Sequence, residues 1–207
     1  MRFRLGNLPE TEECQPEPAG WRRLHGPNAR SAYLVAGMMG LALLCTLCVG
    51  LAMVSLLTSR GLPSEPRESV ATPWGILIAV LLLYIPVHEI LHIAWHPRFG
   101  LSDRTQVLVW PAKMRFGAYY EGCMSRGRWL AMRSSPFIVL SLIPAATLAL
   151  CSKTSLDFAV ETCLLLLMIV NAVGSGGDAI AIAWVLSQTP RRADLCFQGG
   201  RAYWRLK

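Results

Sequence analysis

Charge is scarce in this sequence. Only 16% of the 207 residues are charged, whereas 53% are hydrophobic and the mean hydropathy is +0.39. This composition is too apolar for an ordinary soluble domain and predicts a membrane protein. Lys and Arg (20) outnumber Asp and Glu (13), but the sequence has no basic soluble segment, so we expect no nucleic-acid partner. It also lacks internal repeats and low-complexity tracts, which excludes solenoid and fibrous architectures.

Four apolar runs account for most of the hydrophobicity. A transmembrane helix needs about 20 predominantly apolar residues, and the first run, Tyr33 to Leu57, has 25 residues without a charge. The second run carries two histidines and a glutamate near its end, the third contains Pro144, and the fourth contains three closely spaced glycines. We predict an all-α membrane protein with four transmembrane helices, at about residues 33–57, 72–96, 134–151 and 156–186.

The positive charges predict how these helices are oriented. Seventeen of the 20 Lys and Arg residues fall in segments 1–32, 97–133 and 187–207, and three fall in the two other loops. Because Lys and Arg concentrate in cytoplasmic loops, we expect an inner-membrane protein with both termini in the cytoplasm. Segment 1–32 is then a polar tail rather than a cleaved signal peptide, and 187–207 is a basic tail. The positive charges would also contact anionic lipid headgroups of the bilayer.

Three of the four histidines fall within nine residues, and two of them form an HExxH motif, His88-Glu89-Ile90-Leu91-His92. On a helix, residues four apart share one face, so both imidazoles can bind one Zn²⁺. Glu89 is turned about 100° from His88, which lets it act on a metal-bound water as general base. The alternative is histidine packing at a helix end, but it leaves a glutamate inside an apolar helix, which is costly.

Catalytic zinc usually takes three protein ligands, and we predict that Asp178 is the third. If the second helix enters the membrane from outside near Thr72 and the fourth near Glu161, His88 and His92 lie 16 to 20 residues in, and Asp178 lies 17 residues in. The three side chains should therefore lie at about the same depth. A carboxylate inside an apolar segment is expensive and usually marks function.

Two other residues are alternatives for the third ligand. His96 is two helical turns from His88, about 12 Å, which is too far for both to bind one metal, and Pro97 disfavours helix at His96. We therefore expect His96 to be an interfacial or second-shell residue. Glu121, in the loop 97–133, is the more distant alternative.

Polar residues near Asp178 share its helical face. Asn171, Gly174, Ser175 and Asp178 are spaced as i, i+3, i+4 and i+7. The glycines would let the fourth helix approach the second closely or unwind locally beside a cavity. Asn171 can orient a substrate carbonyl or form an interhelical hydrogen bond. We regard Asn171, Ser175 and His96 as candidate second-shell or substrate residues.

The loop 97–133 contains two segments with strand character, Thr105–Trp110 and Arg115–Tyr120. A hairpin there could accept an extended substrate as an additional strand; the alternative is an amphipathic connector on the headgroups. The seven cysteines are scattered, and those of the apolar CxxC at 45–48 are interpreted as packing residues. Cys151 and Cys163 are the disulfide candidate.

The sequence resembles the putative zincin peptidase family of bacterial membrane proteins, which is distantly similar to site-2 intramembrane metalloproteases. The resemblance rests on HEILH at 88–92, on the loop-to-helix passage at 117–144 and on NAVGSGGD at 171–178, and it covers about residues 72–205. It implies zinc bound by the two histidines of the motif and the distal aspartate, and hydrolysis of a peptide bond near the membrane. The proline and LDG turn of site-2 proteases are missing from the third motif, which weakens transfer from that group.

These observations predict a membrane zinc metallopeptidase that cleaves a peptide or a membrane protein at the cytoplasmic face, with residues 72–186 as its zincin-like membrane domain. A catalytically silent zinc-binding regulator or scaffold would keep the same ligands and is the alternative. A divalent-cation carrier would need polar residues along several helices. The first apolar run offers almost none, which argues against a carrier.

Overall fold

The computed structural model describes residues 1–6, 20–25, 29–57, 71–110, 115–151, 156–198 and 201–207. The chain divides into two compact units. Unit 1 comprises Met1–Ala32, Glu89–Ser135 and Asp178–Lys207, and unit 2 comprises Tyr33–His88 and Pro136–Gly177.

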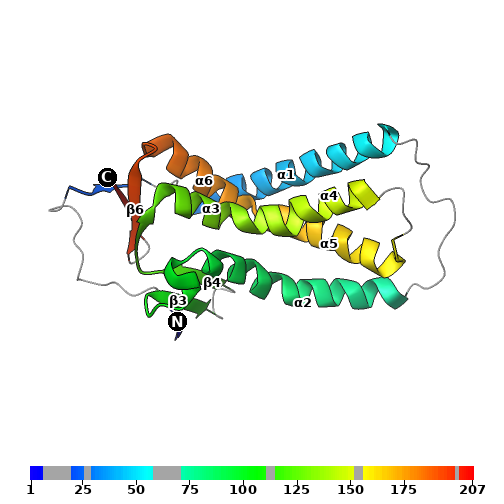
Figure 1. The fold of residues 1–207 in the computed structure, drawn as a ribbon, viewed down its shortest axis with the longest axis horizontal. Coiled ribbons are helices and arrows are strands. Elements are labelled where there is room, and N and C mark those ends of the chain that lie inside the picture. The colour runs from blue at the N-terminus through cyan, green and yellow to red at the C-terminus, as the bar shows by residue number, and fades with distance from the viewer. Residues whose placement is uncertain (7–19, 26–28, 58–70, 111–114, 152–155, 199–200) are drawn as a thin grey trace. The chain divides into compact units, whose positions relative to one another are not determined.

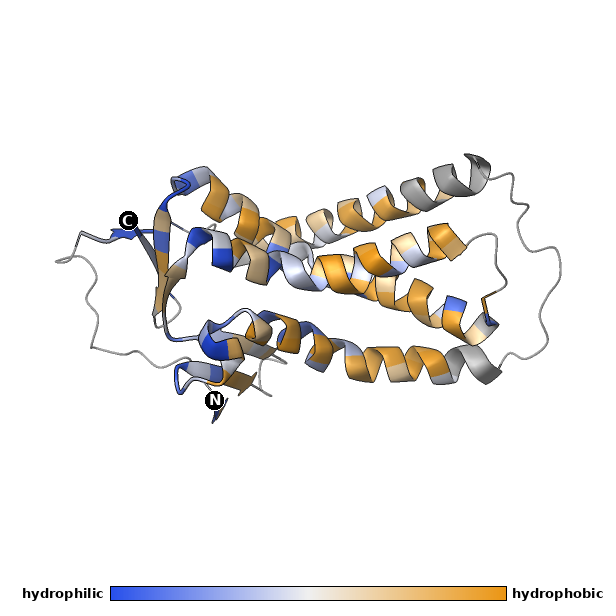
Figure 2. Cartoon of the chain, in the orientation of Figure 1, coloured by the Kyte–Doolittle hydropathy of each residue, from blue (hydrophilic) through white to orange (hydrophobic). Residues whose placement is uncertain are grey.

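Unit 2 consists of helices. The elements that contribute to it are α1 (Ala29–Leu57), α2 (Ala71–Ala94), the π-helical turn η4 (Ile138–Leu142), α4 (Ile143–Leu150) and α5 (Phe158–Gly174), labelled in Figure 1 except for the π turn. Figure 2 shows hydrophobic residues along most of α2, α4 and α5. Asp157 caps the start of α5 by accepting a hydrogen bond from the Ala159 N–H. The buried core is formed by Leu47, Met168 and Ala172.

Glycines allow the helices of unit 2 to approach closely. A Cβ added at Gly40 of α1 would collide with the carbonyl oxygen of Val173 in α5, and a Cβ at Gly174 would collide with the hydroxyl of Tyr84 in α2. The expectation that the glycines bring the last apolar segment close to the second is thus confirmed at Gly174. The same segment also breaks, because α5 ends at Gly174 and α6 (Gly176–Gln188) begins after Ser175.

Unit 1 contains two sheets. The first has the order β1-β3-β4, in which β1 (Arg2–Leu5) pairs in parallel with β3 (Thr105–Trp110), and β3 pairs antiparallel with β4 (Arg115–Tyr120). The second is antiparallel and has the order β2-β7-β6-β5; its strands are β2 (Arg22–Arg23), β7 (Arg201–Leu206), β6 (Ala193–Gln198) and β5 (Gly122–Ser125). The predicted hairpin strands in the loop are confirmed with the bounds expected from the sequence.

The core of unit 1 joins the second sheet to two helices. Trp129 and Met132 of α3 (Arg126–Phe137), Val185 of α6 and Leu195 of β6 belong to one buried cluster. The ring of Trp129 also stacks on Phe197, with centroids 5.8 Å apart. This packing explains why α3 begins at Arg126, well before the apolar run that starts at Pro136: its first turns bury one face, with Trp129 and Met132, in the core of unit 1.

The prediction of an all-α protein with four transmembrane helices is wrong. In the described part of the chain, seven strands form two sheets. Two helices there are long and apolar enough to cross a membrane, Gly75–Ala94 and Arg126–Leu150. A third span results if α5 and α6, which are bent by 44°, are taken together. Leu34–Val49, the continuous part of α1 whose side chains are described, is apolar but shorter than such a span.

Of the strands outside the loop hairpin, β1, β2 and β5 were missed because their partners lie far apart in the sequence. β6 and β7 are close in sequence, and the Gly199-Gly200 pair between them is a hairpin signal that we overlooked. Arg22 pairs with Trp204, and Arg23 with Tyr203, across almost the whole chain. The charges of these two terminal segments suggested solvated tails, and no local sequence pattern predicts a pairing between β2 and β7.

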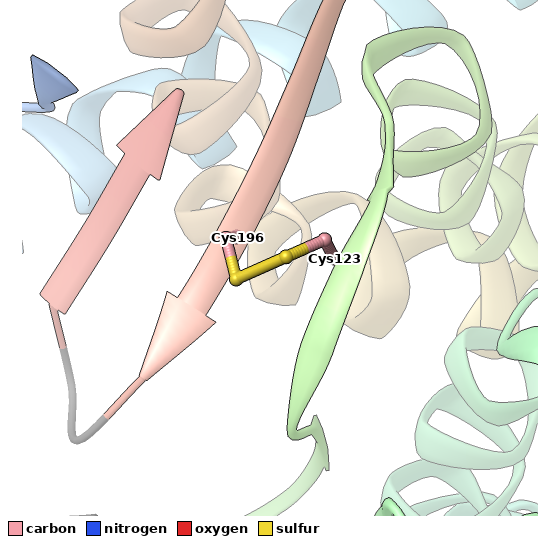
Figure 3. The surroundings of a disulfide bond; sticks show 2 residues. All are labelled: Cys123 and Cys196. Atoms are coloured by element: carbon pink, nitrogen blue, oxygen red, sulfur yellow. A yellow bond between two sulfur atoms is a disulfide. The ribbon is translucent and has the colours of Figure 1, made fainter. Parts of the chain in front are cut away.

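The disulfide prediction is also wrong. No disulfide joins Cys151 to Cys163, whereas Cys123 of β5 is bonded to Cys196 of β6 (Figure 3). These two cysteines lie directly opposite each other in the antiparallel register, with Cα atoms 4.1 Å apart. Directly opposed residues of neighbouring strands are close enough for this bond, but the sequence alone does not reveal the pairing.

Candidate metal centre

The HExxH motif lies in the last two turns of α2, which continues to Ala94 even though Pro86 lies inside it. His88 and His92 are both buried, and Glu89 is half-buried. Since the helix is continuous between the two histidines, their side chains lie on one face, one turn apart. The local geometry required by the motif is therefore present.

The imidazole of His92 is oriented by the backbone of α3. Its Nδ1 lies 2.9 Å from the carbonyl oxygen of Met132. A carbonyl can only accept a hydrogen bond, so Nδ1 must be the protonated nitrogen of the neutral ring. The lone pair is then on Nε2, which lies 3.3 Å from Oδ2 of Asp178.

The imidazole of His88 is oriented in the same way by a side chain. Its Nδ1 lies 2.9 Å from Oδ1 of Asn171. The amide nitrogen of Asn171 donates to the carbonyl of Pro136 (3.0 Å) and to the hydroxyl of Ser141 (2.8 Å). Because this nitrogen is used as a donor, the amide oxygen faces His88 and accepts its Nδ1 proton. The lone pair of His88 is therefore also on Nε2.

Asp178 supplies the third candidate ligand. It lies in the first turn of α6, is buried, and accepts a hydrogen bond from Arg133 at 2.8 Å through Oδ1. Each of the three residues His88, His92 and Asp178 offers one ligand atom, and these three atoms lie within 4.8 Å of one another. Two imidazole nitrogens and one carboxylate oxygen form a donor set typical of catalytic zinc, so the residues fit this ion.

Residues 81–193 match the model of a family described as "Putative zincin peptidase". The chain belongs to this family. The matched segment contains the HExxH motif and Asp178, and zincins bind zinc through such a motif. Searches of curated proteins and of solved structures gave no match.

Glu89 of this zincin-family chain is held outside the ligand group. Its Oε2 accepts a hydrogen bond of 2.6 Å from the backbone N–H of Ala118 in β4. Glu89 does not belong to the group of three candidate ligands found among the described residues. This arrangement suits a carboxylate that exchanges protons rather than one that binds a metal.

His96 and Glu121 are likewise outside the ligand group. His96 is buried against Tyr120, with ring centroids 5.3 Å apart, and its carbonyl accepts a hydrogen bond from Arg128. Burial, followed by the charges of His92, Arg133 and Arg128, lowers the pKa of His96 from 6.5 to about 4. Glu121 accepts a hydrogen bond from Gln106 at 2.7 Å.

The remaining candidates, Asn171 and Ser175, differ in their roles. Asn171 orients His88 through a hydrogen bond, which is one of the two roles we considered for it. The other role, a contact with substrate, stays a prediction. Ser175 lies at the break between α5 and α6 and is buried, and its hydroxyl has no hydrogen-bond partner among the described residues.

Sequence reasoning missed the contacts made by α3. The carbonyl of Met132 orients His92, and the side chain of Arg133 binds Asp178. A backbone carbonyl leaves no sequence signal. Arg133 did leave one, since it is the last charged residue before the third apolar run, but we counted it only as a topological charge.

Proposed function

We propose that this protein is a membrane-embedded zinc metalloendopeptidase that hydrolyses a peptide bond at or near the cytoplasmic face of the inner membrane. The observation that carries the proposal is the shared orientation of the two imidazoles, both of which use Nδ1 for a hydrogen bond to a fixed acceptor. Such contacts fix the tautomer and the ring orientation of zinc-binding histidines. His88, His92 and Asp178 would hold the ion.

Bound zinc supplies Lewis acidity, which lowers the pKa of a coordinated water and polarises the scissile carbonyl. Glu89 acts as the general base and then as the general acid. It accepts a proton as the water oxygen adds to the carbonyl carbon, and it returns this proton to the amine nitrogen as the C–N bond breaks. The hydrogen bond from Ala118 holds one carboxylate oxygen, Oε2, while Oε1 exchanges the proton.

The substrate would bind in extended form along β4. The N–H of Ala118 points away from β3, because it donates to Glu89. In an antiparallel pair the N–H and C=O of such a residue both face the outer edge of the strand. Because Glu89 already takes the Ala118 N–H, a peptide or an unwound segment of a membrane protein would pair with the Ala118 carbonyl and with the outward-facing groups of Phe116 and Tyr120. Binding as an added strand would expose an amide that a helix would keep hydrogen-bonded.

The membrane setting is supported by the two candidate spans, Gly75–Ala94 and Arg126–Leu150. We retain the orientation in which both termini are cytoplasmic, on the strength of the Lys and Arg distribution. The bilayer and the substrate are the partners that this proposal requires.

The proposal can be tested on the purified full-length protein in detergent. Zinc content is measured by elemental analysis, and cleavage by mass spectrometry of a proteome-derived peptide library. We expect the wild type to bind one zinc and cleave, E89Q to bind zinc without cleaving, and D178N to lose zinc. E121Q is the matched control and should behave as the wild type. Full zinc occupancy in a wild type that cleaves no peptide would overturn the peptidase assignment in favour of a zinc-binding regulator.

A further inference from the structure

The two oxygens of the Asp178 carboxylate have different partners. Oδ1 accepts a hydrogen bond of 2.8 Å from the guanidinium of Arg133, whereas Oδ2 faces Nε2 of His92 at 3.3 Å. Hydrogen bonds between guanidinium and carboxylate groups are charge-assisted and directional. Arg133 therefore distinguishes the two oxygens, and the oxygen on the histidine side is the one presented to a metal.

Arg133 is itself held in position by the core of unit 1. Its guanidinium lies over the ring of Trp129, 5.6 Å from the ring centroid. Trp129 is 2% exposed and stacks on Phe197 of β6. The Arg133 side chain, 34% exposed, thus leans on a rigid aromatic pair rather than moving freely in solvent.

Neighbouring residues of α3 contact two of the candidate ligands. Met132 accepts a hydrogen bond from His92 through its carbonyl, and Arg133, the next residue, donates one to Asp178. A single turn of α3 therefore orients a ligand of α2 and a ligand of α6. An ion pair that merely stabilised the fold would not need to be adjacent in sequence to the residue that orients His92.

We propose that Arg133 is a positioning residue, which holds Oδ1 of Asp178 so that the carboxylate binds zinc through Oδ2 alone. This inference rests on the proposed metal site. Loss of a contact that orients a ligand typically lowers metal affinity 10–100-fold. Removing the Arg133 cation reduces its repulsion of Zn²⁺ and so acts in the opposite direction, but a partly exposed charge is screened by solvent. We therefore expect the geometric effect to dominate.

The test measures metal binding rather than activity. Zinc affinity is determined by competition with a fluorescent chelator, and the coordination number is read from the visible absorption of the Co²⁺-loaded protein, which weakens as the number rises. In R133A the freed carboxylate can bind through both oxygens. We expect the zinc affinity of R133A to be at least about tenfold lower than that of the wild type, and its Co²⁺ absorption to be weaker. R133K and R133Q each keep a donor and should be intermediate.

The matched control is R128A. Arg128 lies on the same helix and donates to the carbonyls of Trp95 and His96 but to none of the candidate ligands, so R128A should keep wild-type affinity and absorption. Wild-type values in R133A would overturn the positioning role while leaving the metal site intact. A wild type that binds neither zinc nor cobalt would overturn the proposed function as well. If R133A fails to fold, R133K and R133Q decide, since wild-type values in both would refute the proposal.

Discussion

The side-chain oxygen of Asn171 lies 2.9 Å from Nδ1 of His88, and the amide nitrogen of the same asparagine binds two other acceptors. Asn171 is therefore not a freely rotating polar group. It fixes both the tautomer and the direction of the imidazole that begins the HExxH motif. This relationship leads to the first prediction.

Substitution of Asn171 by Ala should lower zinc affinity 10–100-fold, because the ring of His88 loses the contact that orients it. Chelator competition on purified protein would measure the change. S141A removes one acceptor of the Asn171 amide but keeps the Pro136 carbonyl, so it should cause a smaller loss. Unchanged zinc affinity in N171A would mean that packing alone orients His88.

Adjacent glycines at the start of α6 should respond differently to alanine. A Cβ at Gly176 would collide with the carbonyl oxygen of Ala36, whereas a Cβ at Gly177 would meet nothing within 4 Å. G176A should lower the free energy of unfolding by about 1–3 kcal/mol through overpacking. G177A should be neutral or stabilise by up to about 1 kcal/mol, because alanine favours helix. Thermal unfolding in detergent would compare the two, and equal stabilities would contradict the close approach of α1.

The Ala118 N–H should contribute to catalysis. A118P removes this donor without removing a hydrogen bond to β3, because the N–H faces Glu89. We expect slower peptide cleavage with unchanged zinc content, since Glu89 loses the contact that holds it. A118G keeps the N–H and is the control; if it slowed cleavage as much as A118P does, strand distortion would be the cause instead.

Acid should destabilise the folded protein through His96. Burial lowers the pKa of this side chain from 6.5 to about 4. Between these values the unfolded state binds more protons, so the free energy of unfolding falls as the pH drops from 6.5 towards 4, by up to about 3 kcal/mol. H96F keeps an aromatic ring against Tyr120 but cannot titrate. Stability measured from pH 7.5 to 4.5 should fall less in H96F than in the wild type, and parallel curves would refute the role of His96.

Local patterns predicted part of the fold and of the site. The strands Thr105–Trp110 and Arg115–Tyr120 are adjacent in sequence, so residue preference and the short connection were enough to locate them. The HExxH spacing and the depth of Asp178 selected the three residues that the structure brings together. The first argument depends only on helix geometry, whereas the second also assumed four continuous membrane helices, and the structure instead breaks the last apolar segment at Ser175.

Apart from the hairpin of β6 and β7, which the Gly199-Gly200 pair could have revealed, the remainder depends on contacts that no short segment encodes. β2 and β7 pair across almost the entire sequence, and the charges of both strands resembled those of solvated tails. Arg133 looked like one more cytoplasmic charge, although its partner is 45 residues away. Cys123 and Cys196 are opposed only because β5 and β6 are neighbours in a sheet that we had not predicted.

The interruption at Ser175 has a consequence for how the proposed metal site would be filled. Because a new helix starts at Gly176, the buried carboxylate of Asp178 lies at the positive end of the α6 dipole and beside Arg133. Its negative charge is thus compensated by the polypeptide itself. The apoprotein should accordingly remain folded, so that a chelator can strip the cation and later addition can restore it without any refolding.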